Sequence, residues 1–251
     1  MSEHIQIERR GAVQVIRLDR PDKKNALTRA MYVAMTEALK SGDADPGVRC
    51  HVFLGVPGAF SAGNDLADFL AFSRGGKHGN EAFDLLEALA RSEKPIVSGV
   101  DGIAVGIGTT IHLHCDLTFA TPRTLFHTPF VDLGITPEAG SSLIAPLVMG
   151  RQQAFALLGL CEPFPAERAK ACGLIYEVVG EDELEEAVLA AAERIAGKPP
   201  EALRIARDLM RGDREELVAR IREESRLFAA RLTSDEAKAA FQAFMARKKP
   251  A

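Results

Sequence analysis

Apolar and polar positions alternate through residues 4–8 and 12–18, and Gly11 stands between the two runs. Alternation places successive side chains on opposite faces of a strand, so this pattern predicts a β-hairpin. The next segment, 28–39, begins with a threonine and repeats methionine and leucine at helical spacing. It therefore predicts a helix whose first N–H groups are capped by the Thr28 side chain.

The rest of the chain changes character along its length. Two apolar runs, 50–54 and 95–100, predict buried strands, and each is followed by a glycine-containing turn. The second turn leads into a helix predicted to reach about residue 114. Shorter strands are predicted over 116–120, 124–127 and 174–179, and further helices over 81–92, 137–149 (with Pro137 in the first turn), 151–159, 165–172, 182–196, 199–211, 213–231 and 233–247. The first part thus repeats a strand–turn–helix unit, and the last part is helical.

The two glycine turns are Phe60-Ser61-Ala62-Gly63-Asn64-Asp65-Leu66 and Asp101-Gly102-Ile103-Ala104-Val105-Gly106-Ile107-Gly108. Glycine permits a sharp turn and a close approach of a ligand to the main chain. The start of a helix adds unpaired N–H groups and the positive end of a dipole. Two such N–H groups that converge on a carbonyl oxygen form an oxyanion hole, which stabilises an enolate. The alternative for each turn alone is a tight turn without a ligand.

Composition narrows the class of protein. The chain has 251 residues, 47% of them hydrophobic, which suits one domain with a large core. Its net charge of −4 argues against a nucleic-acid partner, and no apolar run approaches the ~20 residues that span a bilayer. The four scattered cysteines form no CxxC pair, and the first residues lack the apolar core of a secretory signal. We expect a cytoplasmic protein that does not bind membranes.

Three segments together resemble the crotonase (enoyl-CoA hydratase/isomerase) superfamily: 20–27 (Arg-Pro-Asp-Lys-Lys-Asn-Ala-Leu), 60–66 and 99–120. The resemblance covers nearly the whole chain. It implies an α/β fold, with a crotonase-type ββα spiral core over 1–195 and a C-terminal α-helical trimerisation region over 196–251. It also implies a homotrimer or a dimer of trimers, and acyl-CoA thioester substrates.

The same resemblance implies which main-chain groups form the hole, namely the N–H groups of Asn64 and Ile107. The adjoining turn residues are then expected to contact the substrate; they are Ala62, Gly63, Asp65, Leu66 and Gly106. The glycines at 102, 106 and 108 do not have the GxGxxG spacing of a dinucleotide site.

Hydratases of this family resemble one another in having two glutamates. At the matching positions this chain has Thr110 and Phe130, neither of which can act as an acid or base near neutral pH. The segment 126–142 instead resembles the delta-3, delta-2-enoyl-CoA isomerase branch, whose base matches Glu138. One carboxylate suffices to move a proton from the alpha to the gamma carbon if an apolar pocket raises its pKa.

Two alternatives to that role remain. Glu138 could be a first-turn acid that complements a helix dipole. Asp132 is a rival base if the strand at 124–127 continues past Phe130. His112 and His114 diverge at i, i+2 spacing, so no metal pair is expected, and neither is a cofactor other than the coenzyme A of the substrate.

Substrate contacts are expected from Lys23 toward a coenzyme A phosphate, from Phe130 as a wall of the pocket, and from Phe241 in the segment that reaches coenzyme A. The alternative for the lysines is a solvated surface charge, and for the phenylalanines plain core. The sequence thus predicts an enzyme, an isomerase that converts 3-enoyl-CoA to conjugated 2-enoyl-CoA in fatty acid metabolism. The alternatives are an enoyl-CoA hydratase or other acyl-CoA lyase, and a non-catalytic acyl-CoA-binding protein of the same fold.

Overall fold

The computed structural model describes residues 2–65 and 79–247. The predicted hairpin is confirmed: strands β1 (Ile5–Arg10) and β2 (Val13–Leu18) pair antiparallel, with Ile5 opposite Leu18. The other strands are β3 (Cys50–Leu54), β4 (Ala59–Ser61), β5 (Ile96–Val100), β6 (Ile103–Val105), β7 (Leu117–Ala120), β8 (Leu125–His127), β9 (Phe164–Pro165) and β10 (Glu177–Val178).

Successive strands of the core alternate between two sheets. The larger sheet has the order β1-β2-β3-β5-β7-β10, and the smaller has the order β4-β6-β8-β9. Strands β3, β5 and β7 pair in parallel, as do β4, β6 and β8. Each turn of the chain therefore adds one strand to each sheet, which makes the core a spiral of ββα units.

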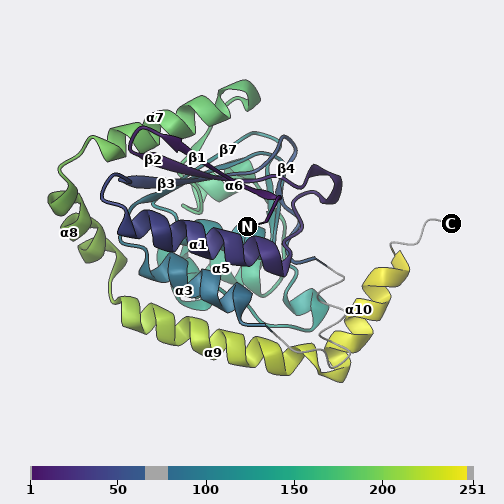
Figure 1. Ribbon diagram of the computed structural model, residues 1–251. Coiled ribbons are helices and arrows are strands. Elements are labelled where there is room, and N and C mark those ends of the chain that lie inside the picture. The colour runs from purple at the N-terminus through teal and green to yellow at the C-terminus, as the bar shows by residue number, and fades with distance from the viewer. Residues whose placement is uncertain (1, 66–78, 248–251) are drawn as a thin grey trace.

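Helices cover both faces of the larger sheet (Figure 1). Helix α7 (Leu184–Ala196) packs on one face, against β3 and β5. On the other side, α1 (Arg29–Ala44) lies beside α3 (Glu81–Arg91), and α3 in turn packs on α9 (Arg214–Leu232). The remaining helical segments are η1 (Pro21–Lys23), α4 (Ile107–Thr110), η2 (Ile111–His114), η3 (Val131–Leu133), α5 (Ser141–Leu158), α6 (Ala166–Ala171), η4 (Glu181–Glu183), α8 (Pro200–Arg211) and α10 (Asp235–Arg247).

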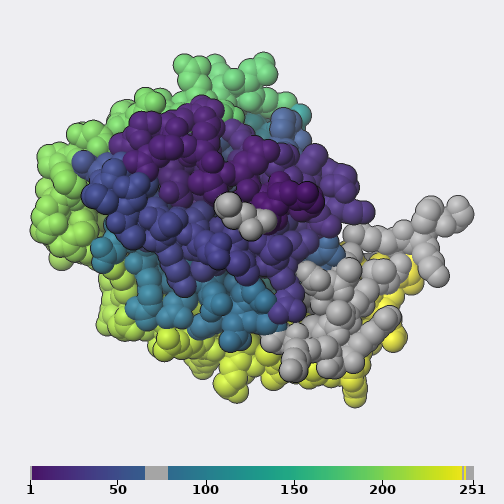
Figure 2. Space-filling model, in the orientation of Figure 1, coloured from purple at the N-terminus to yellow at the C-terminus, as the bar shows by residue number. Residues whose placement is uncertain are grey.

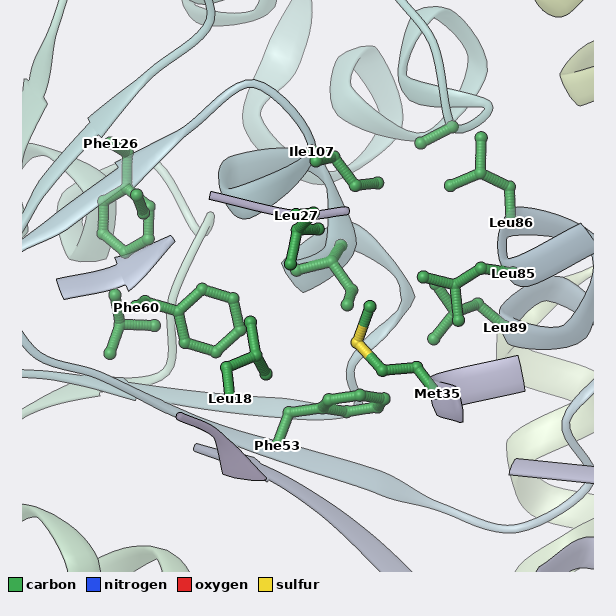
Figure 3. Packing of buried hydrophobic residues seen from close by; sticks show 14 of the residues in the cluster. Leu18, Leu27, Met35, Phe53, Phe60, Leu85, Leu86, Leu89, Ile107 and Phe126 are labelled. Carbon is green, nitrogen blue, oxygen red and sulfur yellow. The ribbon is translucent and has the colours of Figure 1, made fainter. Parts of the chain in front are cut away.

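Strand alternation divides the buried side chains between two clusters. Phe53 of β3 faces α1 and α3, whereas its neighbours Val52 and Leu54 face α7. Figure 3 shows Phe53 beside Leu18 and Met35 in the first cluster. Full burial of a side chain of this size stabilises the fold by roughly 1.5–3 kcal/mol. Packing of these two clusters stabilises the ββα spiral from which the two glycine turns project.

Two sequence predictions need correction in this part of the fold. The helix expected over 137–149 begins at Ser141, so Pro137 precedes it and is not in its first turn. The reason is that Ala139 and Gly140 both have positive φ, 65° and 68°, which no helix accommodates. The strand expected over 174–179 is reduced to Glu177–Val178. The predicted cap is confirmed, since the Thr28 side chain accepts from the Met31 N–H, and the helix continues beyond 39 to Ala44.

The C-terminal segment is helical, as predicted. Helices α8, α9 and α10 follow one edge of the molecule and wrap around the spiral (Figures 1 and 2). The buried Arg207 of α8 joins this segment to the core through Asp116, at 2.8 Å. Among the described residues, none of the helices is long and apolar enough to cross a bilayer.

Candidate active site

The two glycine turns leave neighbouring parallel strands at the same edge of the smaller sheet. Ser61 of β4 is in register with Ala104 of β6, and the first turn follows Ser61 while the second follows Val105. Strand β8 lies on the other side of β6, with His127 opposite Val105. The carboxyl ends of parallel strands meet at one edge, so three consecutive loops gather there. The third loop leads from His127 to Glu138.

In the first turn, the N–H of Asn64 points away from Leu27, the residue with which Asn64 pairs. Leu27 donates to Gly63 O at 2.8 Å and accepts from Asp65 N at 2.9 Å, which is a parallel bridge centred on Asn64. In such a bridge the central residue's own N–H points the other way. Gly63 has φ 86°, and a Cβ there would stand 2.9 Å from Val105 O. Only glycine fits where the two turns touch.

The second turn is built around Gly106, whose φ is 57°. Its N–H donates to His127 O at 2.8 Å, and its carbonyl accepts from Thr109 N at 2.8 Å and Thr110 N at 3.0 Å. Ile107 is the first residue of α4, so its N–H has no acceptor within the helix. Its side chain is buried in the core beside Leu27 (Figure 3), which fixes the backbone at this point.

Glu138 ends the third loop and is half-buried. The Thr110 hydroxyl donates to its carboxylate Oε1. Burial raises the pKa of Glu138 to about 8; the hydrogen bond from Thr110 opposes this rise, and the negative charge of Glu224 adds to it. Because α5 begins only at Ser141, Glu138 is not a first-turn acid of that helix. The structure thus removes the dipole alternative and places a carboxyl of raised pKa next to the second turn.

Glu224 of α9 holds the turn that follows Glu138. Its carboxylate accepts from Gly140 N at 2.6 Å, from Ser142 N at 2.9 Å and from the Ser142 hydroxyl at 2.5 Å. The side chain is only 5% exposed, and burial raises its pKa. Ser141 and Ser142 open α5, so Glu224 supplies from another helix the cap that this helix lacks in its own sequence.

Tyr32 of α1 bonds to the first turn and experiences the charge of Glu138. Its buried hydroxyl donates to the Asn64 side-chain Oδ1 at 2.6 Å. Burial, and secondly the negative charge of Glu138, raise the pKa of Tyr32 well above 10. Beside it, Arg20 forms an ion pair with Asp65 at 2.6 Å. The side chains of Asn64 and Asp65 are therefore both held by groups that precede the first turn in the chain.

Sequence reasoning missed Tyr32 and Glu224. A glutamate at position 224 continues the i, i+3 series of buried residues Val218 and Ile221, and that interruption of an apolar stripe is a readable signal. Tyr32 stands among other buried residues of α1 and gives no such signal. The sequence identifies Thr110 only as the residue that replaces a hydratase glutamate, and it does not predict the hydrogen bond from Thr110 to Glu138.

The other predicted site residues lie as follows. Phe130 is buried, and its ring comes within 3.9 Å of a Cβ built on Gly106. Ala62 is half-buried beside Gly63. Lys23 ends η1 and is exposed, and Phe241 is buried on α10 in the main core cluster. Leu66 lies outside the described residues.

The rival base is not part of this cluster. The strand that carries His127 ends there, and Asp132 follows in η3, where its side chain is exposed. The strand does not continue past Phe130, so Asp132 does not point to the same side as Phe130 through strand alternation. Among residues 2–65 and 79–247, no three His, Cys, Asp or Glu side chains are grouped as a metal ion would require.

The chain is similar to known proteins over nearly its whole length. The family model described as "Enoyl-CoA hydratase/isomerase" matches residues 8–251. Rat "Enoyl-CoA delta isomerase 2" is 36% identical over 98% of this chain, and the chain spans 64% of that protein's length. A "Probable enoyl-CoA hydratase" of Rhizobium meliloti (strain 1021) is 31% identical, over 98% of this chain and 96% of its own length.

Among solved structures, Pseudomonas aeruginosa OdaA superposes with a TM-score of 0.92 at 42% identity, covering 97% of this chain and 99% of its own. This likeness confirms the predicted crotonase-type α/β fold with a C-terminal helical region. The printed names of the relatives include both isomerases and hydratases.

Proposed function

Because the chain belongs to the enoyl-CoA hydratase/isomerase family, we propose that it is a delta-3, delta-2-enoyl-CoA isomerase that acts in fatty acid metabolism. The observation that carries the proposal is the position of Glu138, a carboxyl of pKa about 8 bonded to Thr110 of α4, the helix into which the second turn leads. Thr110, which the family resemblance matches to a hydratase glutamate, thus has an uncharged hydroxyl that donates a hydrogen bond to Glu138.

The proposed reaction moves one proton. The ionised Glu138 removes a proton from the alpha carbon of a 3-enoyl-CoA, and the electron pair of that C–H bond delocalises into a dienolate. The thioester oxygen takes the negative charge and is held by the N–H groups of Asn64 and Ile107. Glu138 then returns its proton to the gamma carbon, and the double bond becomes conjugated with the thioester. No water, metal or redox cofactor enters the balance.

Substrate handling is proposed on the same basis. Phe130 forms a wall beside Gly106, and the exposed Lys23 meets a coenzyme A phosphate. Phe241 is buried in the main core cluster, and its contact with the substrate is proposed from the family resemblance alone. Replacement of Lys23 by alanine should raise KM for acyl-CoA and leave kcat unchanged; an unchanged KM would remove Lys23 from the site.

The outer surface supports assembly of several copies. Large apolar side chains on α5 and α8 are exposed, including Leu147 at 80%, Leu209 at 81% and Met210 at 79%. Exposed apolar side chains of this size are typical of protein interfaces. We propose that they are covered in a homotrimer or a dimer of trimers. Sedimentation of a monomer at micromolar concentration would contradict this.

The function is tested with the unmodified protein and two substrates. Turnover of a 3-enoyl-CoA to the conjugated thioester increases ultraviolet absorbance, whereas hydration of crotonyl-CoA decreases it. We expect the first reaction to be faster by at least about 100-fold, because the second needs an acid and a base at once. Faster hydration would favour the hydratase alternative, and tight coenzyme A binding without either reaction would favour a binding protein.

A further inference from the structure

Thr110 is fully buried at the end of α4 and has two hydrogen-bond acceptors within reach of its hydroxyl. The first is the carboxylate oxygen Oε1 of Glu138. The second is the backbone carbonyl of Gly106, one helical turn earlier, at 3.4 Å. Gly106 also carries the turn from which the Ile107 N–H projects, so the threonine joins the carboxyl to the second glycine turn.

A hydroxyl has one proton to donate and two lone pairs that accept. When Glu138 is ionised, the Thr110 proton points to the carboxylate, because a charged acceptor is stronger than a carbonyl. When Glu138 is protonated, the carboxyl O–H donates to Thr110 Oγ1, and the threonine proton turns to Gly106 O, as buried threonines in helices do. The Glu138–Thr110 hydrogen bond thus exists in either protonation state.

We propose that Thr110 is a positioning residue that holds the Glu138 carboxyl at one place before and after it takes the substrate's proton. The inference rests on the proposed function, in which one carboxyl must first accept and then donate at two carbons of the same substrate. A carboxyl that rotated away after protonation would lose the proton to water or return it to the alpha carbon.

The titratable groups near Glu138 must be separated in any test. They include His114, whose Nε2 bonds Ala139 O at 2.8 Å, and Arg220, which donates to the Ser142 hydroxyl at 3.2 Å. Glu224 of α9 raises the pKa of Glu138 through its negative charge, and Tyr32 of α1 experiences the charge of Glu138 in turn. The hydrogen bond from Thr110 acts in the opposite direction to burial and lowers the pKa of Glu138. Removing the hydroxyl should therefore raise the pKa of Glu138 and leave the side chains of Glu224 and Tyr32 in place.

The experiment compares Thr110→Val, Thr110→Ser and the unmodified protein. Carboxyl-¹³C glutamate labelling, with Glu138→Gln for assignment, follows the titration of Glu138 by NMR. We expect Thr110→Val to raise the titration midpoint by about one pH unit and to lower kcat about 10-fold at a pH where Glu138 is ionised, with KM unchanged. Thr110→Ser restores most of both. Thr118→Val is the control, since Thr118 is also buried but bonds Ser98 at 2.9 Å.

An unchanged Glu138 titration and unchanged kcat in Thr110→Val would overturn the proposal. So would equal losses in the valine and serine variants, because they would indicate packing and not the hydroxyl. If valine prevents folding, Thr110→Ala takes its place with the same expectations. The NMR readout does not depend on turnover, so a protein without isomerase activity would refute the proposed function while the Glu138 titration still decides the role of Thr110.

Discussion

Glu224 accepts a hydrogen bond at 2.6 Å from the backbone N–H of Gly140, a residue 84 positions earlier in the chain. Gly140 follows Glu138 by two residues, and Ala139 between them has a positive φ of 65°, a conformation that costs a non-glycine residue about 1 kcal/mol or more. The carboxylate of a C-terminal helix therefore stabilises the turn that aims the candidate base. This makes helix α9 part of the site's support and not only of the outer wrapping.

Replacing Glu224 by glutamine tests this support. The variant keeps one acceptor oxygen but loses the charge and at least one of the three bonds, so we expect kcat/KM to fall about 10-fold and the free energy of unfolding to fall by about 1–3 kcal/mol. Since the charge of Glu224 raises the pKa of Glu138, the midpoint of the pH–rate profile should move to lower pH. Glu216→Gln, an exposed glutamate of the same helix, is the control. A profile unchanged in height and midpoint would contradict the role.

Tyr32→Phe removes the hydroxyl that holds the Asn64 side chain and leaves the ring in the core. With its side chain released, the Asn64 backbone is less fixed at the point where its N–H is proposed to meet the thioester oxygen. Loss of about 1 kcal/mol of orientation corresponds to a decrease of about 5-fold in kcat/KM for a 3-enoyl-CoA. Tyr176→Phe alters the chain's other tyrosine, which is exposed, and should leave the rate unchanged. Equal rates for the two variants would remove Tyr32 from the site.

The raised pKa of Glu138 should make the free energy of unfolding depend on pH. Its pKa is about 8 in the folded state and 4.5 in the unfolded state, so between these pH values the folded protein binds more protons than the unfolded chain. Stability from this group is complete below about pH 4.5 and is lost as the pH rises toward 8. Glu138→Gln has no such loss, so at pH 8.5 it should be more stable than the unmodified protein by on the order of 2 kcal/mol.

Denaturant unfolding of both proteins at pH 5 and pH 8.5 measures this difference. The advantage of the glutamine variant should grow between the two pH values. An advantage that is constant with pH would mean that the Glu138 carboxyl is not desolvated in the folded protein.

Much of the fold was predictable because it depends on local patterns. The alternation at 4–18 gave the hairpin, and the capping threonine gave the start of α1. The start of α5 was misplaced since proline at a first turn is a common signal, whereas the turn at Ala139 and Gly140 is held by Glu224 from a distant helix. The division of strands between two sheets is likewise a tertiary property; it entered the sequence analysis only through the family resemblance.

The site was predictable to the extent that it is built from backbone. The glycines at 63 and 106 mark positions where a side chain is excluded or φ is positive, and this is visible in one sequence. The partners of the site residues could not be identified, because Tyr32, Thr110 and Glu224 reach the site only through folding. The polar interruption of the apolar stripe of α9 marks Glu224 but not the groups that it bonds. Their hydrogen bonds depend on register and helix packing, which no local pattern encodes.

The most direct test of the account is the turnover of a 3-enoyl-CoA by Glu138→Gln, measured against pH beside the unmodified protein. For the latter, kcat/KM should rise about tenfold per pH unit below about 8 and level off above it, because the base must be ionised. The glutamine variant, with its fold verified by its unfolding transition, should be slower by about 10³-fold on the plateau above pH 8 and should not show the rise with pH. Turnover in the variant comparable to that of the unmodified protein would contradict the claim that one carboxyl carries the proton.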